Sequence, residues 1–499
     1  MYKKSVKAML LLACLALVVL LYSSTTHYSP MLRHYISPEL KQESYAGLWP
    51  AAKNGSESAL NMLSELAALN NDIFWLEKVA SLQNLQAILA LADLSDGSNK
   101  TFWWQQAAII GHAPSQFELS FLVDSIQQRI RYLEQAAMNE HIPAIIALSK
   151  FYYENRDASN ALRWLTRAVE YDKSSTFKLA RMLFREGFEA QARAAFNKAV
   201  AYTPIAKNYV DVLNNYKQTT LSSLISQPTS MPAYCAQQLQ FVATSLDGAV
   251  QAMNIKHAFE RDKRLSTLPI CVSSIIWLAQ NELECDLADG RKVCDLSSVA
   301  KQSFVPNYTH LVFFLEEGKA YVNDGAMFLA QDDTYAVFVH ELAHFVGFVD
   351  EYSLPSALAQ QHCYKSYAPN LLVSNDEILY EHEKYQLWQR YQDQLILLNL
   401  PNRGEELSED KQSNKYTKRL SLDIAPSLTC ESLDLTAYKP SSQLTFMEYH
   451  DTRNIPPIYI LMWKDLLKQR HHDIAVTALF MKSAQQSDNQ GAALYWSGF

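Results

Sequence analysis

A block of large side chains that ends in two small residues recurs along the first half of the chain. Successive copies start 28, 29, 32 and 31 residues apart, at Phe74, Phe102, Arg131, Arg163 and Ala194. A period of about 30 residues leaves room for two helices per repeat, and stacked helix pairs bury one continuous core. The small residues that close each block let neighbouring helices approach closely. The sequence therefore predicts an all-α helical-repeat solenoid over residues 40–215.

The copy from Trp103 to Ala113 has the order Trp-Trp-x-x-Ala-Ala-x-x-Gly-His-Ala. This pattern resembles the Sel-one-like repeat (SLR), a relative of the tetratricopeptide repeat (TPR), although most of that repeat's glycines are absent from the other copies. The resemblance implies a concave face that binds a peptide or a partner protein. The alternative is a packed spacer between the N-terminal segment and the second half of the chain.

The composition changes after a Ser-, Thr-, Gln- and Pro-rich stretch at 216–233, which predicts a linker. Beyond it, short apolar runs such as Thr309–Leu315 are suited to buried strands. Two further short runs flank Asn323-Asp324-Gly325, which predicts a hairpin. We therefore expect a multidomain chain, with an α/β (α+β) domain over 234–485 and a C-terminal tail at 486–499.

Within that domain, the segment His340-Glu341-Leu342-Ala343-His344 places two histidines four residues apart. Residues four apart share one face of a helix, so both imidazoles can bind a single zinc ion. Glu341 stands beside the first ligand, where it can act as general base toward a zinc-activated water. The sequence therefore predicts one catalytic Zn²⁺ with His340 and His344 as ligands, on a buried helix whose N-cap lies within 332–334.

A catalytic zinc site takes three protein ligands and keeps a fourth position open. Gly347 can adopt the left-handed conformation that ends a helix, after which Asp350 can return to the metal. Glu351 and His362 compete with Asp350 for the third position, and Asp350 could instead hydrogen bond to a ligand. The spacing His-Glu-x-x-His-x-x-Gly-x-x-Asp resembles the zinc motif of metzincin peptidases. Its continuation, Asp-Glu-Tyr at 350–352, resembles the IgA-peptidase-like family and implies a metzincin-like zinc peptidase domain.

Metzincins carry a methionine turn beneath the metal, and Leu444–Tyr449 reads Leu-Thr-Phe-Met-Glu-Tyr. The resemblance implies that Met447 is this methionine; the alternative is an ordinary core residue. It also implies that Tyr449 donates a hydrogen bond to the oxyanion of the tetrahedral intermediate, against a simple packing role. The strand from about Gly318 to Leu329 resembles the edge strand that pairs with an extended substrate.

Six of the seven cysteines lie after residue 230, which predicts three disulfides in an exported domain. Cys285 and Cys294 flank the turn Asp289-Gly290 and are expected to pair. The remaining pairings stay open among Cys235, Cys271, Cys363 and Cys430. Free thiols in the core are the alternative.

The N-terminus has the pattern of a signal segment, because Lys3, Lys4 and Lys7 precede an apolar run from Ala8 to Tyr22. Its positive flank places that end inside. No small-x-small cleavage site follows, which favours an uncleaved single-pass anchor at 1–24 with the bulk of the chain periplasmic or extracellular. The alternative is a secreted protein whose signal peptide is removed.

Together these patterns predict an exported zinc metalloendopeptidase, a hydrolase whose helical repeats recruit a protein or peptide substrate or a partner protein. One alternative is a non-enzymatic interaction scaffold with a structural or degenerate zinc domain. Another is a zinc amidase that acts on cell-wall peptides. The net charge of −8 and the lack of a basic tract give no sign of nucleic-acid binding. The substrate, the cleavage specificity and the role of residues 353–430 stay open.

Overall fold

The computed structural model describes residues 45–225, 234–279, 281–364, 368–374, 382–397, 423–469 and 475–498. The chain divides into two compact units, Met1–Ala206 and Lys207–Phe499. The predicted signal segment at 1–24 lies outside the described residues. Among the helices that the structure does describe, none is long and apolar enough to cross a lipid bilayer.

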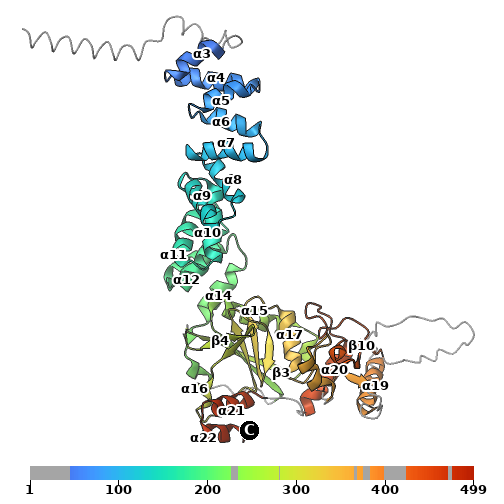
Figure 1. The fold of residues 1–499 in the computed structure, drawn as a ribbon. Coiled ribbons are helices and arrows are strands. Elements are labelled where there is room, and N and C mark those ends of the chain that lie inside the picture. Colours follow the sequence, from blue (N-terminus) through green and yellow to red (C-terminus); the bar gives the residue numbers. More distant parts are fainter. Residues whose placement is uncertain are drawn as a thin grey trace, which may run out of the picture. The chain divides into compact units, whose positions relative to one another are not determined.

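The first unit is built from helices that follow one another in antiparallel pairs (Figure 1). The five repeated blocks fall in alternate helices, α5, α7, α9, α11 and α13, which confirms the predicted helical repeats. The helices are α3 (Tyr45–Lys53), α4 (Glu57–Leu69), α5 (Ile73–Ala80), α6 (Leu85–Asp93), α7 (Gly97–Ile109), α8 (Ala113–Leu122), α9 (Ile126–Met138), α10 (Ile142–Glu154), α11 (Ala158–Ala168), α12 (Ser175–Arg185) and α13 (Glu189–Ala199).

The alanines that close the repeated blocks are buried, and Ala107 and Ala136 have no exposed surface, whereas Val200 of the last copy is 37% exposed. The large side chains differ from copy to copy. Trp164 is fully buried, but Phe74 is 61% exposed and Phe102 is 48% exposed. Neighbouring helical residues point about 100° apart, so only one of two adjacent rings can face the core. In these two copies the ring that packs inward is the following tryptophan, Trp75 or Trp103.

One turn geometry links the helices within the repeats. The second residue after the helix end, which follows the C-cap, has a positive φ at Asn71, Gly111, Glu140, Arg156 and Gly187. Its N–H and that of the next residue bond back to carbonyls of the last helical turn, as in Glu140 to Ala137 and His141 to Ala136. Non-glycine residues therefore occupy the left-handed position in several copies, at a modest conformational cost. This explains why the glycine signal of the repeat is weak in the sequence.

The second unit contains a six-stranded sheet in the order β1-β3-β2-β6-β8-β7. All neighbouring strands in it are parallel except β7, which pairs antiparallel with β8 through the predicted turn at 323–325. The predicted strand at 309–315 is confirmed as β6. The strands are β1 (Gln218–Thr219), β2 (Gln237–Ala243), β3 (Ile270–Leu278), β6 (His310–Leu315), β7 (Tyr321–Asn323) and β8 (Ala326–Ala330).

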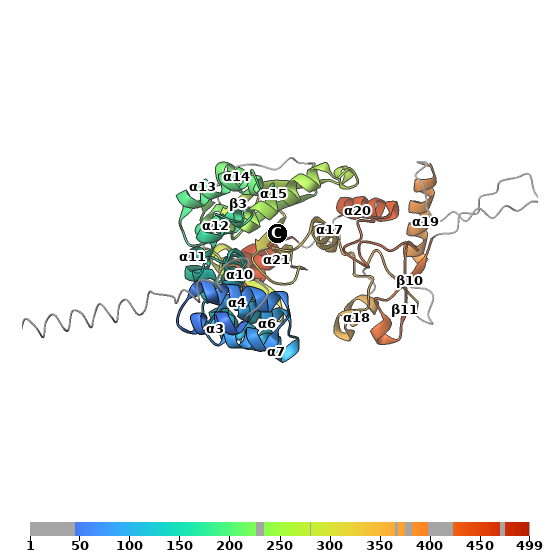
Figure 2. The same cartoon turned by 90° about the horizontal axis from the view of Figure 1, so that it is seen from above.

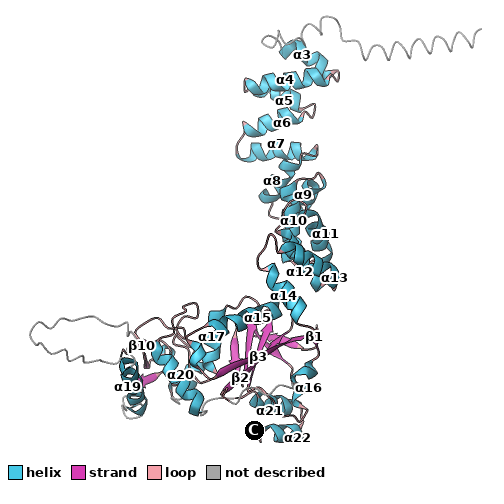
Figure 3. Ribbon diagram, turned by 180° about the vertical axis from the view of Figure 1, so that it is seen from behind, coloured by secondary structure: helices cyan, strands magenta, loops and turns pink. Residues whose placement is uncertain are grey.

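Helices cover both faces of this sheet, so the second unit is a layered α/β structure (Figure 3). Helices α15 (Leu246–Arg261) and α17 (Tyr335–His344) lie on one face, where Phe338 packs against Phe241 and Phe259. Gly248 allows α15 to approach β6, because a Cβ there would lie 2.8 Å from the Phe314 carbonyl oxygen. The opposite face is covered by η2 (Leu221–Leu224), α16 (Ser297–Ala300), α21 (Thr477–Gln486) and α22 (Gln490–Trp496).

The chain after α17 builds a smaller region with its own antiparallel sheet, in the order β10-β11-β9. Figure 2 shows α20 beside α17 and the small sheet between α18 and α19. This region contains most of the predicted 353–430 insertion. Its elements are α18 (Ser356–Cys363), β9 (Leu372–Ser374), α19 (His382–Leu397), β10 (Ala425–Ser427), η4 (Glu431–Leu433), β11 (Thr436–Lys439) and α20 (Pro457–Gln469).

Three disulfides join the six cysteines of the second unit, as predicted. Cys285 pairs with Cys294 across the hairpin of β4 (Cys285–Ala288) and β5 (Arg291–Cys294), the local pair expected from the sequence. The other two disulfides are Cys235–Cys271 and Cys363–Cys430. Cys363–Cys430 connects α18 to the segment before η4 and lies in a small apolar core.

Several predicted domain boundaries differ from those observed. Part of the expected linker at 216–233 is packed: β1 extends the sheet at β3, and Leu224 is buried beneath it. Residues 226–233 lie outside the described chain. The expected tail at 486–499 contains α22, whose Trp496 is buried and donates to the Ala300 carbonyl at 2.7 Å. Both segments pack because they contain apolar residues, and these residues complete the core on one face of the sheet.

The end of the predicted repeat region also belongs to the second unit. Helix α14 (Ala206–Asn215) follows the boundary at Ala206. Its Tyr209 hydroxyl donates to Asp247 Oδ1 at 2.5 Å, at the start of α15. The helix therefore packs on the α/β unit, a tertiary contact that its repeat-like sequence does not reveal.

Candidate metal centre

Helix α17 carries the two histidines of the sequence motif. It begins at the N-cap Thr334, within the predicted range, where the threonine side chain accepts from the Val337 N–H. It ends just after His344, and Gly347 has a φ of +89°, the left-handed conformation expected there. The chain then turns back past the end of the helix toward the face that carries His340.

Both imidazoles have a fixed tautomer, because each Nδ1 faces a backbone carbonyl. His340 Nδ1 donates to the Phe446 carbonyl oxygen at 2.8 Å, and His344 Nδ1 donates to that of Phe348 at 2.7 Å. A carbonyl oxygen can only accept, so the Nδ1 atoms carry the protons. In the neutral rings each Nε2 therefore presents a lone pair, the form in which histidine binds metals.

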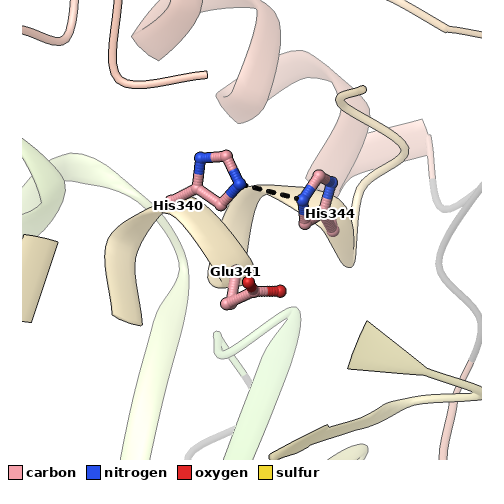
Figure 4. Close-up of side chains that lie close together, drawn as sticks. All are labelled: His340, Glu341 and His344. Atoms are coloured by element: carbon pink, nitrogen blue, oxygen red, sulfur yellow. Dashed lines mark hydrogen bonds between the residues drawn. The ribbon is translucent and has the colours of Figure 1, made fainter. Parts of the chain in front are cut away.

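The two Nε2 atoms face one another 3.3 Å apart, as the dashed line in Figure 4 marks. Asp350 Oδ1 completes the group, 3.0 Å from His340 Nε2 and 3.3 Å from His344 Nε2. This oxygen is buried, and as long as both histidines carry their proton on Nδ1 alone it accepts no hydrogen bond from them. Three atoms with lone pairs thus converge on one point, which is unfavourable unless a cation or a proton lies between them.

The separations fit a tetrahedral zinc ion. Ligand atoms about 2.05 Å from a tetrahedral ion are about 3.3–3.4 Å from one another. The three observed separations are 3.3, 3.0 and 3.3 Å. Two imidazole nitrogens and a carboxylate oxygen also form a common ligand set of catalytic zinc. The residues present therefore fit the metal that the sequence predicts.

Without a cation, a proton relieves the same repulsion. Burial disfavours a charged His344, but the hydrogen bond and negative charge of Asp350 outweigh it and raise the pKa of His344 to about 9. Burial likewise opposes ionisation of Asp350, yet the two imidazoles hold the pKa of its carboxyl well below the usual range. Asp350 is therefore a carboxylate in a strongly cation-attracting position.

Glu341 belongs to the same cluster. One ligand atom from each of His340, Glu341 and His344 lies within 4.8 Å of the others. The Glu341 side chain is buried, and Figure 4 shows its carboxylate below the pair of rings. Burial raises the pKa of Glu341, partly offset by the two histidines. Asp350 approaches both rings more closely, which leaves Glu341 as the carboxylate beside the ligand set.

The two competitors for the third position lie elsewhere. The Glu351 carboxylate is buried and accepts from Asn370 Nδ2 at 2.8 Å, from Tyr459 at 2.5 Å and from Thr445. It is therefore fully engaged away from the histidines. His362 lies in α18, where burial lowers its pKa and the charge of Asp350 raises it. Among the described residues no hydrogen bond joins its ring to His340 or His344, whereas Asp350 Oδ1 lies 3.0 and 3.3 Å from their Nε2 atoms.

The segment predicted as a methionine turn contacts α17 through His340. Met447 has no exposed surface, and the Glu448 and Tyr449 N–H groups both bond to the Thr445 carbonyl at 3.1 and 3.0 Å. The carbonyl before Met447 accepts the His340 Nδ1 proton. Although 106 residues separate these partners in sequence, the turn fixes the tautomer and orientation of His340.

Tyr449 lies at the end of this turn and is 51% exposed, with its ring 5.7 Å from that of His450. The His450 ring in turn lies 6.3 Å from that of His340, which places both residues beside the cluster.

The sequence did not predict a role for Tyr352. Burial raises its pKa above the ordinary value, and so do the charge of Asp350 and a hydrogen bond to it. The Asp-Glu-Tyr motif is the sequence signal that marks this residue.

Comparison with known proteins finds no matching family model and no matching curated protein. Seven chains of solved structures match, among them two that share part of this chain at low similarity. One is a protective antigen of uropathogenic Escherichia coli that displays an SLR fold, with 20% identity over 34% of this chain and 43% of the antigen, and a TM-score of 0.24. The other is a Sel1 repeat protein from Oxalobacter formigenes, with 16% identity over 39% of this chain and 85% of that one, and a TM-score of 0.24.

Proposed function

We propose that the second unit is a zinc-dependent hydrolase of peptide bonds, with His340, His344 and Asp350 as the zinc ligands. The observation that carries this proposal is the convergence of two Nε2 lone pairs and one buried carboxylate oxygen at tetrahedral spacing. Structural zinc sites are closed by a fourth protein ligand. In this proposal the fourth coordination position is left for a water molecule, and Glu341 lies beside the site as the base that hydrolysis by water requires.

Held by His340, His344 and Asp350, a zinc ion would lower the pKa of a water to about 7 and would polarise the substrate carbonyl. Glu341 then takes a proton from the attacking water and delivers it to the leaving amine. Its burial raises its pKa, which suits a group that must both accept and release a proton near neutral pH. Tyr449 donates to the oxyanion from the exposed side of the turn.

The substrate would be an extended peptide or protein segment. Strand β7 ends the sheet and pairs with β8 alone among the described strands, so one edge of its backbone is available for β-pairing. Alternating side chains of a peptide paired there would point to opposite faces, and one face adjoins α17. A peptide-linked cell-wall substrate has the same scissile amide and remains an alternative for the same chemistry.

Replacing Glu341 with Gln tests this function. The amide keeps the shape of the side chain but cannot accept the proton, so we expect hydrolysis to fall by about 10²–10⁴-fold. The measurement is cleavage of a protein mixture, read by mass spectrometry of new peptide termini, at saturating zinc. Zinc content of the purified variant should equal that of the parent, because Glu341 is not a ligand in this assignment.

The control is His344→Ala, which should lose both zinc and hydrolysis. A Glu341→Gln variant that cleaves the mixture as fast as the parent would exclude Glu341 as the base. A parent protein that binds no zinc would exclude the metal centre itself. Either result is distinct from a folding defect, which circular dichroism of each variant detects.

A non-enzymatic scaffold is a second candidate, and the helical repeats favour it. Large apolar side chains, among them Leu69, Ile109 and Met138, are exposed at helix ends in the first unit. Exposed apolar groups on stacked repeats are typical of surfaces that bind other proteins. If the protein binds zinc but hydrolyses no peptide mixture in a chelator-sensitive manner, the result would support the scaffold rather than the peptidase. In the peptidase, the same repeats recruit the substrate or a partner protein.

We also propose that the protein acts outside the cytoplasm, held by its N-terminal segment. The support comes from the three disulfides of the second unit, since disulfides persist mainly in oxidising compartments. Fractionation of cells followed by thiol labelling tests it. Membrane-associated protein with blocked cysteines agrees with the proposal, whereas reduced protein in the cytosol contradicts it.

A further inference from the structure

Asp350 differs from the two histidines because no helix holds it. It follows α17 in an irregular segment after the Gly347 turn. An irregular backbone has soft dihedrals, so a ligand carried on it needs other contacts to stay within reach of the metal. These contacts come from buried side chains that lie far away in the sequence.

Hydrogen bonds hold the backbone on both sides of Asp350. The Asn370 side chain accepts from the Val349 N–H at 2.9 Å and donates to the Val349 carbonyl at 2.8 Å. The Thr429 hydroxyl donates to the carbonyl of Asp350 itself at 2.7 Å. Glu351 N–H bonds to the Met447 carbonyl at 2.9 Å. Three consecutive residues centred on the ligand are therefore tied to three separate segments.

The Glu351 side chain connects these segments further. Its carboxylate accepts from Asn370 Nδ2 at 2.8 Å, and from Thr445 just ahead of the methionine turn. Asn370, Thr429 and Thr445 have no exposed surface, so bonds lost inside the cluster cannot be replaced by solvent. The network also reaches His340, because the turn after Thr445 supplies the carbonyl that fixes this ligand.

We propose that Asn370 and Thr429 are positioning residues for Asp350 and thereby set the affinity of the centre for zinc. This inference rests on the proposed function, because it takes Asp350 as a ligand. Neither residue touches the metal position. Both act on the main chain that presents the carboxylate, and such outer contacts typically change metal affinity by about 10–100-fold when removed.

Thr429→Val tests the inference, because valine has nearly the shape of threonine but no hydroxyl. We expect zinc affinity, measured by competition with a chromogenic chelator on the full chain, to fall by about 10–100-fold. Thr429→Ser restores the hydroxyl and should recover most of the affinity. Asn370→Leu, which removes the bonds to Val349 and Glu351, should weaken zinc binding in the same way.

Thr244→Val is the matched control. Thr244 donates to the Phe314 carbonyl at 3.2 Å at the end of β2, on the sheet rather than in the network. The Thr244→Val variant also loses a hydroxyl-to-carbonyl bond, which at 3.2 Å is longer than the 2.7 Å bond of Thr429, and its zinc affinity should equal that of the parent. Urea unfolding of each variant with excess chelator measures the stability cost alone.

Three results would overturn the inference. Parent-like zinc affinity in both Thr429→Val and Asn370→Leu leaves the zinc centre intact but removes the positioning role. A parent that binds no zinc removes the proposed function and this inference together. A loss of affinity that Thr244→Val shares in proportion to its loss of stability assigns the effect to general destabilisation and also contradicts the proposal.

Discussion

Among single residues, two tyrosines compete for the role of oxyanion donor. Tyr449 follows the methionine turn and is half exposed, whereas the Tyr352 hydroxyl hydrogen bonds to Asp350. A phenol engaged with a ligand carboxylate is less free to donate to a reacting carbonyl. We therefore propose separate roles for the two residues: Tyr449 would donate to the substrate oxyanion, and Tyr352 would support Asp350 as the third zinc ligand.

Tyr449→Phe should lower kcat by about 10²–10³-fold at saturating zinc, the usual cost of one lost oxyanion donor. KM should change little, because the bond forms only in the transition state. Tyr352→Phe should instead weaken zinc binding and recover its kcat when zinc is added in excess. Steady-state kinetics at several zinc concentrations check both. A kcat loss in Tyr352→Phe that zinc does not restore, with a silent Tyr449→Phe, would reverse the assignment.

Residue spacing in the sequence was enough to find the residues on and just after α17. His340 and His344 are brought together by the helix repeat alone, and Gly347 signals the turn that returns Asp350 to the same face. Asn370 and Thr429 gave no such signal. They act through hydrogen bonds to a backbone that approaches them only in the folded structure, and polar residues in irregular segments look alike in a sequence.

At the scale of whole elements, the disulfides differ in the number of residues that they enclose, and this number sets how much each one stabilises the fold. Cys363–Cys430 joins residues 67 apart, and Cys285–Cys294 joins residues 9 apart. Closure of the longer loop restricts the unfolded chain more, by about 4 kcal/mol against about 2.5 kcal/mol in the chain-entropy model. The longer loop also carries Asn370 and ends beside Thr429, so its closure supports the segments that hold Asp350.

We therefore expect Cys363→Ala with Cys430→Ala to cost more stability than Cys285→Ala with Cys294→Ala, by roughly 1–2 kcal/mol. Urea unfolding with excess chelator measures the difference. The first pair should also weaken zinc binding, whereas the hairpin pair, which lies outside the network, should not. Equal zinc affinity in both double variants would separate the disulfide from the metal centre.

The elements also show which structural features the sequence pattern predicts and which it does not. The repeat period placed five helices correctly, because buried alanines and aromatic residues recur at a fixed distance. It did not show that Phe74 faces solvent, since a pair of adjacent aromatic residues leaves open which ring turns inward. Nor did it show that Leu224 and Trp496 complete the core of the α/β unit. Each of these short segments is apolar enough to pack, but its partner surface exists only after the sheet has formed.

The whole molecule has two units with separate cores, so zinc should act on only one of them. The proposed ligands all lie in Lys207–Phe499, and a ligand that binds the folded state at 100 times its Kd stabilises that state by about 2.7 kcal/mol. For a unit of this size the shift is roughly 5–10 °C in Tm.

Differential scanning calorimetry of the full chain should show two transitions. One should rise in temperature with zinc and fall with chelator, and the other, from the helical repeats, should not move. His344→Ala should abolish the shift. A single transition that moves with zinc would mean that the two units unfold as one, and a scan in which no transition moves with zinc would argue against the metal centre.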